Sequence, residues 1–327
     1  MNILILSCGT RNKLIRYFKE KENGIDKVVG TDCSIYAPAL YEADSHYIIP
    51  RMTSPDYLET VLDICHKEKI DAVLPLQEDE LYLTASYREQ YRGQGVTPIV
   101  SSAEAIEVCR DKYAFYQHLR KHHLPVLPTC RNITEFQDDY KNGKMDFPVF
   151  IKPVRGCGSI GIQKVENMEL LSVLCKYSTE EMLIQEFADG EEYGADFYVD
   201  MISHKPVSIF IKKKLRMRAG ETEKSVSVKD PVLFDLIRQT ADSLSLSGPV
   251  DMDIFKVGGN YYISEINPRF GGGYPHAYAC GINFPHLIAN NVAGKENADT
   301  IGNYEEGICM LKYTDLITLK LYETTKE

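Results

Sequence analysis

Residues 251–273 read DMDIFKVGGNYYISEINPRFGGG, and this stretch decides how the rest of the chain is interpreted. Two runs, 250–257 and 261–266, alternate between polar and apolar residues as half-buried strands do. The link between them, Gly258-Gly259-Asn260, has the glycine and asparagine chemistry of a tight turn. The sequence therefore predicts a β-hairpin in this stretch.

The polar side chains of this hairpin are oxygen donors. Because successive side chains of a strand alternate between faces, Asp251 and Asp253 share one face, and Glu265 and Asn267 share one face of the partner strand. Opposed carboxylates repel, so a positive group is expected between them. Carboxylate and amide oxygens suit Mg²⁺, with Mn²⁺ as the alternative ion. An acidic hairpin that only faces solvent is the other interpretation.

The composition is that of an ordinary globular protein. With 327 residues and 44% hydrophobic content, the chain is long enough for two or three domains around a sizeable core. The formal net charge of −10 argues against broad binding to nucleic acid or to an anionic membrane, because neither polyanion is drawn to such a surface. An anionic ligand must therefore be met by local basic groups.

The cysteines and the apolar runs indicate the compartment. Nine cysteines occur without a CxxC pair, which does not suggest a zinc site or a disulfide framework. The apolar run at the N-terminus is too short for a signal peptide, and no run approaches the length of a membrane span. We expect a cytoplasmic protein that binds neither nucleic acid nor a membrane.

The first third of the chain alternates strands with helices, which predicts a parallel, Rossmann-like sheet. The expected strands are 2–7, 27–31, 72–76 and 97–100, and the expected helices are 12–21, 55–67, 79–90 and 102–108. Gly9 stands alone where a dinucleotide fingerprint needs three glycines, which argues against an NAD site. Gln77, Glu78 and Asp79 follow a strand at the sheet edge where ligands bind, although helix capping by Glu78 or Asp79 is the alternative interpretation.

A lysine and a glycine-rich loop follow in the middle of the chain. Residues 147–153 predict a strand that carries Lys152, and Gly156, Gly158 and Gly161 then spell GxGxxG. A Rossmann fingerprint requires a helix after these glycines, whereas residues 162–165 look like another strand. A glycine loop between two strands is typical of a flap that covers phosphates. A loose hairpin turn is the alternative.

A further strand, 182–187, contains Gln185 and Glu186, which suit an adenine edge, and Glu192 follows as a candidate for ribose hydroxyls. Each of these acids fits a surface position equally well. The basic run 212–218, KKKLRMR, stands out in an acidic protein and suggests a clamp for phosphate or carboxylate. A solvated edge strand guarded by lysines is the alternative.

Taken together, Lys112, Lys152 with its glycine loop, the Gln185-Glu186-Phe187 segment with Glu192, and the stretch DIFKVGGNYYISEINPRFGGG resemble the ATP-grasp superfamily. The likeness spans nearly the whole chain and is greatest to stand-alone, carbamoyl-phosphate-synthase-like carboxylate–amine ligases. It implies an α/β protein, α+β in its ATP-binding part, with a Rossmann-like parallel-sheet domain before the ATP-grasp fold. The implied domains are 1–110, 111–190 with the glycine loop, and 191–327 with the magnesium and substrate sites.

The resemblance also implies a role for each motif residue. The implied ATP-binding residues are Lys112, Lys152, Gly156, Gly158, Ser159, Gly161, Gln185, Glu186, Phe187 and Glu192. The implied Mg²⁺ ligands are Asp253, Glu265 and Asn267, with Asp251 as an alternative first ligand. Arg269, Lys152 and Arg218 are the implied catalytic residues, and Arg216, Arg218 and Gly272 belong to the substrate site.

The activity that the resemblance implies is amide formation. A carboxylate would attack the γ-phosphate of ATP, and an amine would then displace phosphate from the acyl phosphate. The expected partners are a small carboxylate and a small amine, and a homodimer is the default assembly. The alternatives are an ATP-grasp kinase or carboxylase-like enzyme that makes no amide, and a nucleotide-binding regulatory protein without turnover.

Overall fold

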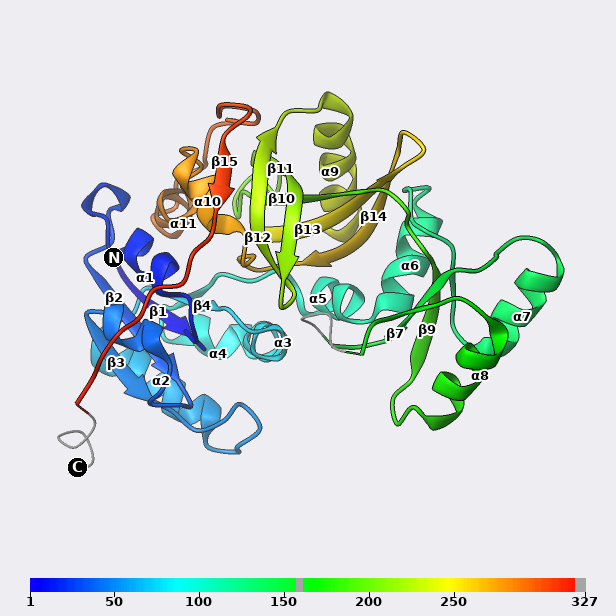
Figure 1. Cartoon of the computed structure of the whole chain (residues 1–327). Coiled ribbons are helices and arrows are strands. Elements are labelled where there is room, and N and C mark those ends of the chain that lie inside the picture. The colour runs from blue at the N-terminus through cyan, green and yellow to red at the C-terminus, as the bar shows by residue number, and fades with distance from the viewer. Residues whose placement is uncertain (157–160, 321–327) are drawn as a thin grey trace.

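The computed structural model describes residues 1–156 and 161–320, and within them the strands form three sheets (Figure 1). Each sheet takes its strands from one continuous part of the chain, and each of these parts falls within one of the three predicted domains. The domain boundaries themselves stay a prediction. The described part of the chain contains no helix that is both long and apolar enough to cross a membrane.

The first sheet is parallel throughout, with the order β3-β2-β1-β4-β5, which confirms the predicted N-terminal architecture. Its elements are β1 Asn2–Leu6, α1 Asn12–Phe18, η1 Lys21–Asn23, β2 Lys27–Asp32, η2 Pro38–Glu42, β3 Ser45–Ile48, α2 Tyr57–Glu68, β4 Ala72–Pro75, α3 Glu78–Ser86, α4 Arg88–Gly93 and β5 Thr97–Pro98. The single helix predicted over 79–90 is wrong, because the chain breaks at Tyr87 into α3 and α4.

Both faces of this sheet are covered, which explains the uninterrupted apolar run of its first strand. Ile3 and Ile5 pack with α1 and with the C-terminal helices α10 (Tyr274–Ala279) and α11 (Phe284–Val292). Leu4 and Leu6 point the other way and pack with α2 and α4. The N-terminal and C-terminal parts of the chain therefore share one apolar core.

The second sheet is small and antiparallel, with the order β6-β9-β7-β8. The helices α5 Ala103–Arg110 and α6 Lys112–Lys121 precede it. The elements of this part of the chain are β6 Thr129–Cys130, α7 Ile133–Lys141, β7 Val149–Pro153, β8 Gln163–Val165, α8 Met168–Tyr177 and β9 Met182–Glu186. The glycine loop joins β7 to β8, so a strand and not a helix follows it, as predicted. Gly158 and Ser159 lie outside the described residues.

The third sheet has the order β14-β13-β10-β11-β12-β15, and all of its pairs are antiparallel. Its elements are β10 Glu191–Val199, β11 Pro206–Arg218, β12 Glu221–Val228, α9 Pro231–Leu244, β13 Gly248–Val257, β14 Asn260–Asn267 and β15 Cys309–Leu311. The predicted hairpin is β13–β14. The basic run lies in β11, an internal strand of the sheet; β10 pairs with it only as far as Lys213, and the rest of the run pairs with β12 alone.

Aromatic side chains join the first sheet to the third. Tyr17 of α1 stacks on Tyr278 of α10 with ring centroids 3.8 Å apart, and Phe18 meets Phe270 edge-on at 5.9 Å. Such pairs add about 0.5–1.5 kcal/mol each beyond the burial of their area. This packing holds the N-terminal sheet beside the loop that follows β14, where the candidate site begins.

Candidate active site

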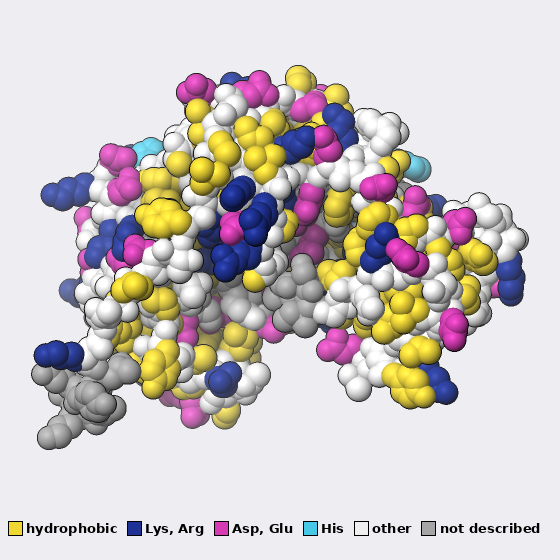
Figure 2. Space-filling model, in the orientation of Figure 1, with side chains coloured by type: hydrophobic (Ala, Val, Ile, Leu, Met, Phe, Trp, Pro, Cys, Tyr) yellow, Lys and Arg dark blue, Asp and Glu magenta, His cyan; other side chains and the backbone are white. Residues whose placement is uncertain are grey.

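A cavity of about 300 Å³ lies where the three parts of the chain meet. Its wall includes Arg11 from the N-terminal part, Lys112 and Lys152 beside the small sheet, and the acidic hairpin of the large sheet. Figure 2 shows basic side chains gathered at the centre of this face, next to a hollow in which acidic side chains are visible. The cavity therefore combines cations and carboxylates within one enclosure.

The pairing of β13 with β14 sets the acidic wall. Asp251 lies opposite Asn267 and Asp253 opposite Glu265, because a register irregularity between Asp253 and Ile254 brings the two predicted polar pairs onto one face. Burial raises the pKa of Asp253 above its ordinary value, and the neighbouring Glu265 adds to the rise. Burial and the nearby Asp253 likewise raise the pKa of Asp251. These carboxyl groups repel one another and would gain from a bound cation.

Lys214 supplies part of the positive charge that the hairpin requires. Its ammonium group lies 2.7 Å from a carboxylate oxygen of Asp253 and 2.7 Å from one of Glu192. Burial alone would lower the pKa of Lys214, but these two carboxylates outweigh it and raise the pKa above its ordinary value. Lys214 reaches Asp253 across β10 at Gly194, where an added Cβ would lie 3.1 Å from the Lys214 stem. The glycine leaves room for this crossing.

Lys152 enters the cavity from β7 and has no carboxylate within ion-pair distance among the described residues. Its ammonium group donates to Gln185 Oε1 at 2.8 Å, and Gln185 Nε2 donates to Thr129 Oγ1 at 2.9 Å. Burial lowers the pKa of Lys152 to about 8, although Glu265 opposes the change. Because its hydrogen-bond partner is neutral, this buried ammonium group would be stabilised by a bound anion.

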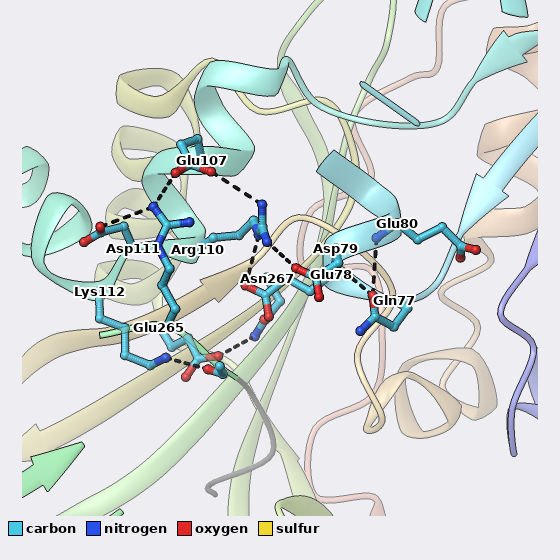
Figure 3. Close-up of polar contacts among 12 residues, drawn as sticks. Gln77, Glu78, Asp79, Glu80, Glu107, Arg110, Asp111, Lys112, Glu265 and Asn267 are labelled. Carbon is cyan, nitrogen blue, oxygen red and sulfur yellow. Dashed lines mark hydrogen bonds and ion pairs between the residues drawn. The ribbon is translucent and has the colours of Figure 1, made fainter. Parts of the chain in front are cut away.

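Lys112 opens α6, whose N-cap Asp111 accepts from the backbone N–H groups of Tyr113 and Ala114. Its ammonium group donates to the carbonyl oxygen of Gly156 at 2.6 Å, which places it at the start of the glycine loop. Figure 3 shows Lys112, Glu265 and Asn267 in one region. The helix start and the loop are thus fixed together at the cavity.

The residues after β4 reach the same region from the N-terminal sheet. Gln77, rather than Glu78 or Asp79, caps α3, because its side chain accepts from the N–H groups of Asp79 and Glu80. Asp79 pairs with Arg110 of α5 (Figure 3). Burial raises the pKa of Glu78, and Glu265 contributes to the rise. The capping interpretation is therefore correct in kind but assigned to the wrong residue.

Two arginines complete the cavity. Arg269 lies 3.7 Å from Asp251 and donates to the carbonyl oxygen of Phe270 at 2.9 Å. Arg11, which precedes α1, lies 3.4 Å from Glu221 of β12. Burial lowers the pKa of Arg11 from its ordinary value, and the positive charge of Arg269 acts in the same direction. Two guanidinium groups that repel each other in a half-closed cavity are suited to an anion.

The structure brings most of the predicted site residues together. The cavity is lined by Lys112, Lys152, Gly156, Glu192, Asp253, Glu265, Asn267, Arg269 and Gly272, and by the alternative ligand Asp251. Gly161, Glu186 and Phe187 do not line it, and the Gln185 side chain is taken up by Lys152. Arg216 and Arg218 also stay outside, because both are exposed and pair with Glu223.

The sequence reasoning missed four polar residues of the cavity: Arg11, Lys214, Glu221 and Thr222. Lys214 belongs to the basic run 212–218, which predicts a clamp for phosphate or carboxylate, but two register irregularities between β11 and β12 follow it. Arg216, between the two irregularities, and Arg218, beyond them, turn outward, whereas Met217 lines the cavity. Arg11 carries no local signal, because only the packing of the two termini brings it to this cavity.

The oxygen donors of the hairpin fit a magnesium ion that takes its further ligands from a phosphate. Among the described residues, no group of three His, Cys, Asp or Glu side chains is arranged to hold a metal alone. The proposed set instead has two carboxylates and the amide of Asn267, whose Nδ2 donates to Glu265 Oε1 at 3.1 Å and leaves its oxygen free. Mg²⁺ commonly takes its remaining ligands from water and substrate phosphates.

Two family models match the chain. A PylC-like N-terminal domain matches residues 3–99, and an ATP-grasp domain matches residues 109–273, slightly more than half of the chain. This protein therefore belongs to the ATP-grasp family, as the motif residues predicted.

The chain is also similar to carbamoyl-phosphate synthases at low identity. A carbamoyl-phosphate synthase from Methanobrevibacter smithii is 25% identical over 90% of this chain and 81% of its own length. The arginine-specific carbamoyl phosphate synthase large chain of Geobacillus stearothermophilus is 24% identical over 80% of this chain, but the match covers 26% of that protein. The chain thus spans about a quarter of this longer relative.

Solved structures confirm the fold. The biotin carboxylase domain of Hydrogenobacter thermophilus 2-oxoglutarate carboxylase, solved with MgADP, ADP and bicarbonate, superimposes with a TM-score of 0.75 at 17% identity, covering 94% of this chain and 73% of that chain. An L-amino acid ligase from Bacillus licheniformis gives a TM-score of 0.69 at 19% identity, covering 91% and 75%.

Proposed function

We propose that this protein is an ATP-dependent carboxylate–amine ligase that forms an amide through an acyl phosphate and releases ADP and phosphate. The observation that carries the proposal is the single cavity that holds Lys112, Lys152 and Arg269 opposite the oxygens of Asp253, Glu265 and Asn267. Family membership and the names of relatives, which include an L-amino acid ligase, support the same reaction class.

In this mechanism the protein positions groups and neutralises charge rather than supplying a nucleophile. A substrate carboxylate oxygen attacks the γ-phosphorus of ATP, and the bond to the bridging oxygen of ADP breaks. The amine then attacks the acyl carbon, phosphate leaves, and the ammonium loses a proton. Lys152 and Arg269 would stabilise the negative charge that gathers on the transferred phosphoryl group, and Lys112 would hold the glycine loop over it.

Asp253, Glu265 and Asn267 would hold Mg²⁺, which when bound would draw charge from the phosphate oxygens. Glu192 lines the cavity and would meet the ribose, with the adenine held beside Gln185, Glu186 and Phe187. Gly156, Gly158, Ser159 and Gly161 would cover the phosphates. Arg216 and Arg218 would have to leave Glu223 to bind a substrate carboxylate beside Gly272.

An ADP-release screen of paired acids and amines, with mass spectrometry of the product, tests the proposal. Hydroxylamine in place of the amine should yield a hydroxamate in the presence of ATP and Mg²⁺. A phosphorylated product that yields no hydroxamate would favour a kinase, and background ADP release across the panel would favour a regulatory nucleotide-binding protein. Lys152→Ala and Glu265→Ala should each abolish turnover while circular dichroism shows a folded protein.

A further inference from the structure

A second cavity, of about 130 Å³, lies at the carboxyl edge of the N-terminal sheet. Its floor and wall are formed by Ser7 after β1, Cys33 after β2, Ile49 after β3, Tyr57 of α2 and Glu80 of α3. None of these residues lines the candidate active site in the described part of the chain. Ligands of open α/β sheets bind at this edge, so the position itself suits a small molecule.

Glu80 is the feature of this cavity that ordinary packing does not explain. Its side chain is 1% exposed. The Tyr57 hydroxyl donates to one carboxyl oxygen, whereas the other, Oε2, has no hydrogen-bond partner among the described residues. Buried carboxyl oxygens are normally satisfied, because leaving one unpaired costs free energy. In Figure 3 the Glu80 side chain points away from Lys112 and Glu265, so the active site does not account for it.

The surroundings of Glu80 favour a positively charged ligand. No Lys, Arg or His forms an ion pair with it in the described residues, and Asp32 nearby adds negative charge. Burial raises the pKa of Glu80 to about 7, against the opposing effect of the Tyr57 hydroxyl; the Ser7 hydroxyl lies nearby but forms no hydrogen bond to Oε2. A donor that arrived with its own positive charge would satisfy the free oxygen and compensate the buried acid together.

The rim of the cavity has the opposite character. Arg51 lines it, is exposed, and forms no ion pair with any described residue. The lining also includes the apolar side chains of Ile49, Pro50 and Met52. A buried acid, a short apolar wall and a guanidinium group at the mouth match the ammonium group, the small side chain and the carboxylate of an amino acid.

We propose that this cavity is a binding site for a small amino acid, whose ammonium group donates to Glu80 Oε2 and whose carboxylate meets Arg51. The site is separate from the nucleotide cavity, and binding there does not require ATP.

Isothermal titration calorimetry with L-alanine, ethylamine and propionate, in the absence of nucleotide, tests the proposal. L-Alanine should bind most tightly, ethylamine more weakly because it lacks the carboxylate, and propionate not measurably. Glu80→Gln keeps the acceptor for Tyr57 but removes the charge, and should weaken L-alanine binding at least about tenfold, since a hydrogen bond to a charged group is worth that much. Glu265→Gln is the matched control in the other cavity and should bind L-alanine as the wild type does.

A labelling experiment on the wild-type protein covers the case in which Glu80→Gln does not fold. Cys33 lines the cavity and is exposed, while Cys309 is exposed on β15. L-Alanine should slow maleimide labelling of Cys33 and leave Cys309 unchanged, as read by peptide mass spectrometry. The proposal is overturned if no probe protects Cys33, if propionate binds as well as L-alanine, if Glu80→Gln retains the wild-type affinity, or if Glu265→Gln loses it.

Discussion

The ammonium group of Lys152 donates a hydrogen bond to Gln185 Oε1 at 2.8 Å, and both side chains are buried beside the small sheet. Gln185 is neutral, so the buried lysine has a hydrogen-bond acceptor but no counter-charge from this partner. Burial consequently lowers the pKa of Lys152 to about 8. The candidate active site thus contains a cation whose charge is present near neutral pH and is lost in mildly alkaline solution.

Nucleotide affinity should fall as the pH rises through this pKa. Below pH 8 Lys152 is mainly protonated and meets a phosphate as a cation, whereas above it a proton must first be taken up. Between pH 7 and pH 9 we expect a loss of about tenfold in the affinity for a nonhydrolysable ATP analogue, measured by calorimetry.

Gln185→Glu is the matched variant for this prediction. It places a carboxylate on Lys152 with almost no change in shape, which should raise the pKa of the lysine and flatten the pH dependence up to pH 9. An affinity that is equally steep in Gln185→Glu, or flat in the wild type, would show that another group titrates.

Lys214→Met should destabilise the protein through the carboxylates that it leaves behind. Asp253 and Glu192 would lose their shared ammonium group in a half-closed cavity. Breaking a fully buried pair costs about 3–5 kcal/mol, and the partial exposure of both acids reduces this to about 2 kcal/mol in the free energy of unfolding. Urea unfolding measures the change, and Mg²⁺ should recover part of it.

Lys213→Met is the control for Lys214→Met. Lys213 pairs with Glu191 at a more exposed position on the same strand, where an ion pair contributes about 0–1 kcal/mol. Equal losses in the two variants would mean that the position in β11, and not the buried charge, sets the stability.

The β13–β14 hairpin was predictable because its information is local. Gly258 and Gly259 both have positive φ angles, of 57° and 86°, as the turn requires. Alternation groups Asp251 with Asp253 and Glu265 with Asn267, but a register irregularity beside Asp253, which alternation does not predict, sets the two groups opposite each other. Lys112, Lys152 and Glu192 could be assigned only by resemblance, since one lysine or acid at a strand or helix end has no signature of its own.

The positions of the site residues that the sequence did not predict depend on long-range packing. Arg11 reaches the cavity because α1 packs against the C-terminal helices, a contact that no local pattern encodes. The turn of Arg216 and Arg218 away from the cavity depends on irregular pairing between β11 and β12, which alternation assumes to be regular. Glu80 looks like an ordinary surface residue of an acidic helix start, yet it is buried.

Gly190→Ala should weaken both the fold and nucleotide binding. A Cβ at this position would lie 2.1 Å from the carbonyl oxygen of Lys256, so β10 must move away from β13 just before Glu192. Overpacking of this kind costs about 1–3 kcal/mol of unfolding free energy. The midpoint of thermal unfolding and the affinity for a nonhydrolysable ATP analogue should both fall. Gly93→Ala, which meets nothing within 4 Å, is the control and should leave both unchanged or raise stability slightly.

Glu265→Gln should separate function from stability. Glu265 accepts a hydrogen bond from Asn267 and forms no ion pair among the described residues, and its charge helps to raise the pKa values of Asp253 and Glu78. Removing that charge relieves repulsion, so without metal the unfolding midpoint should stay the same or rise. The apparent affinity for Mg²⁺ and nucleotide, read from the rise in the unfolding midpoint as they are added, should fall at least about 100-fold. Losing even a group that only supports a metal ligand costs about 10–100-fold in metal affinity. The exposed Asp235→Asn should change neither quantity. A destabilised Glu265→Gln protein that still responds fully to Mg²⁺ would show that this carboxylate is structural.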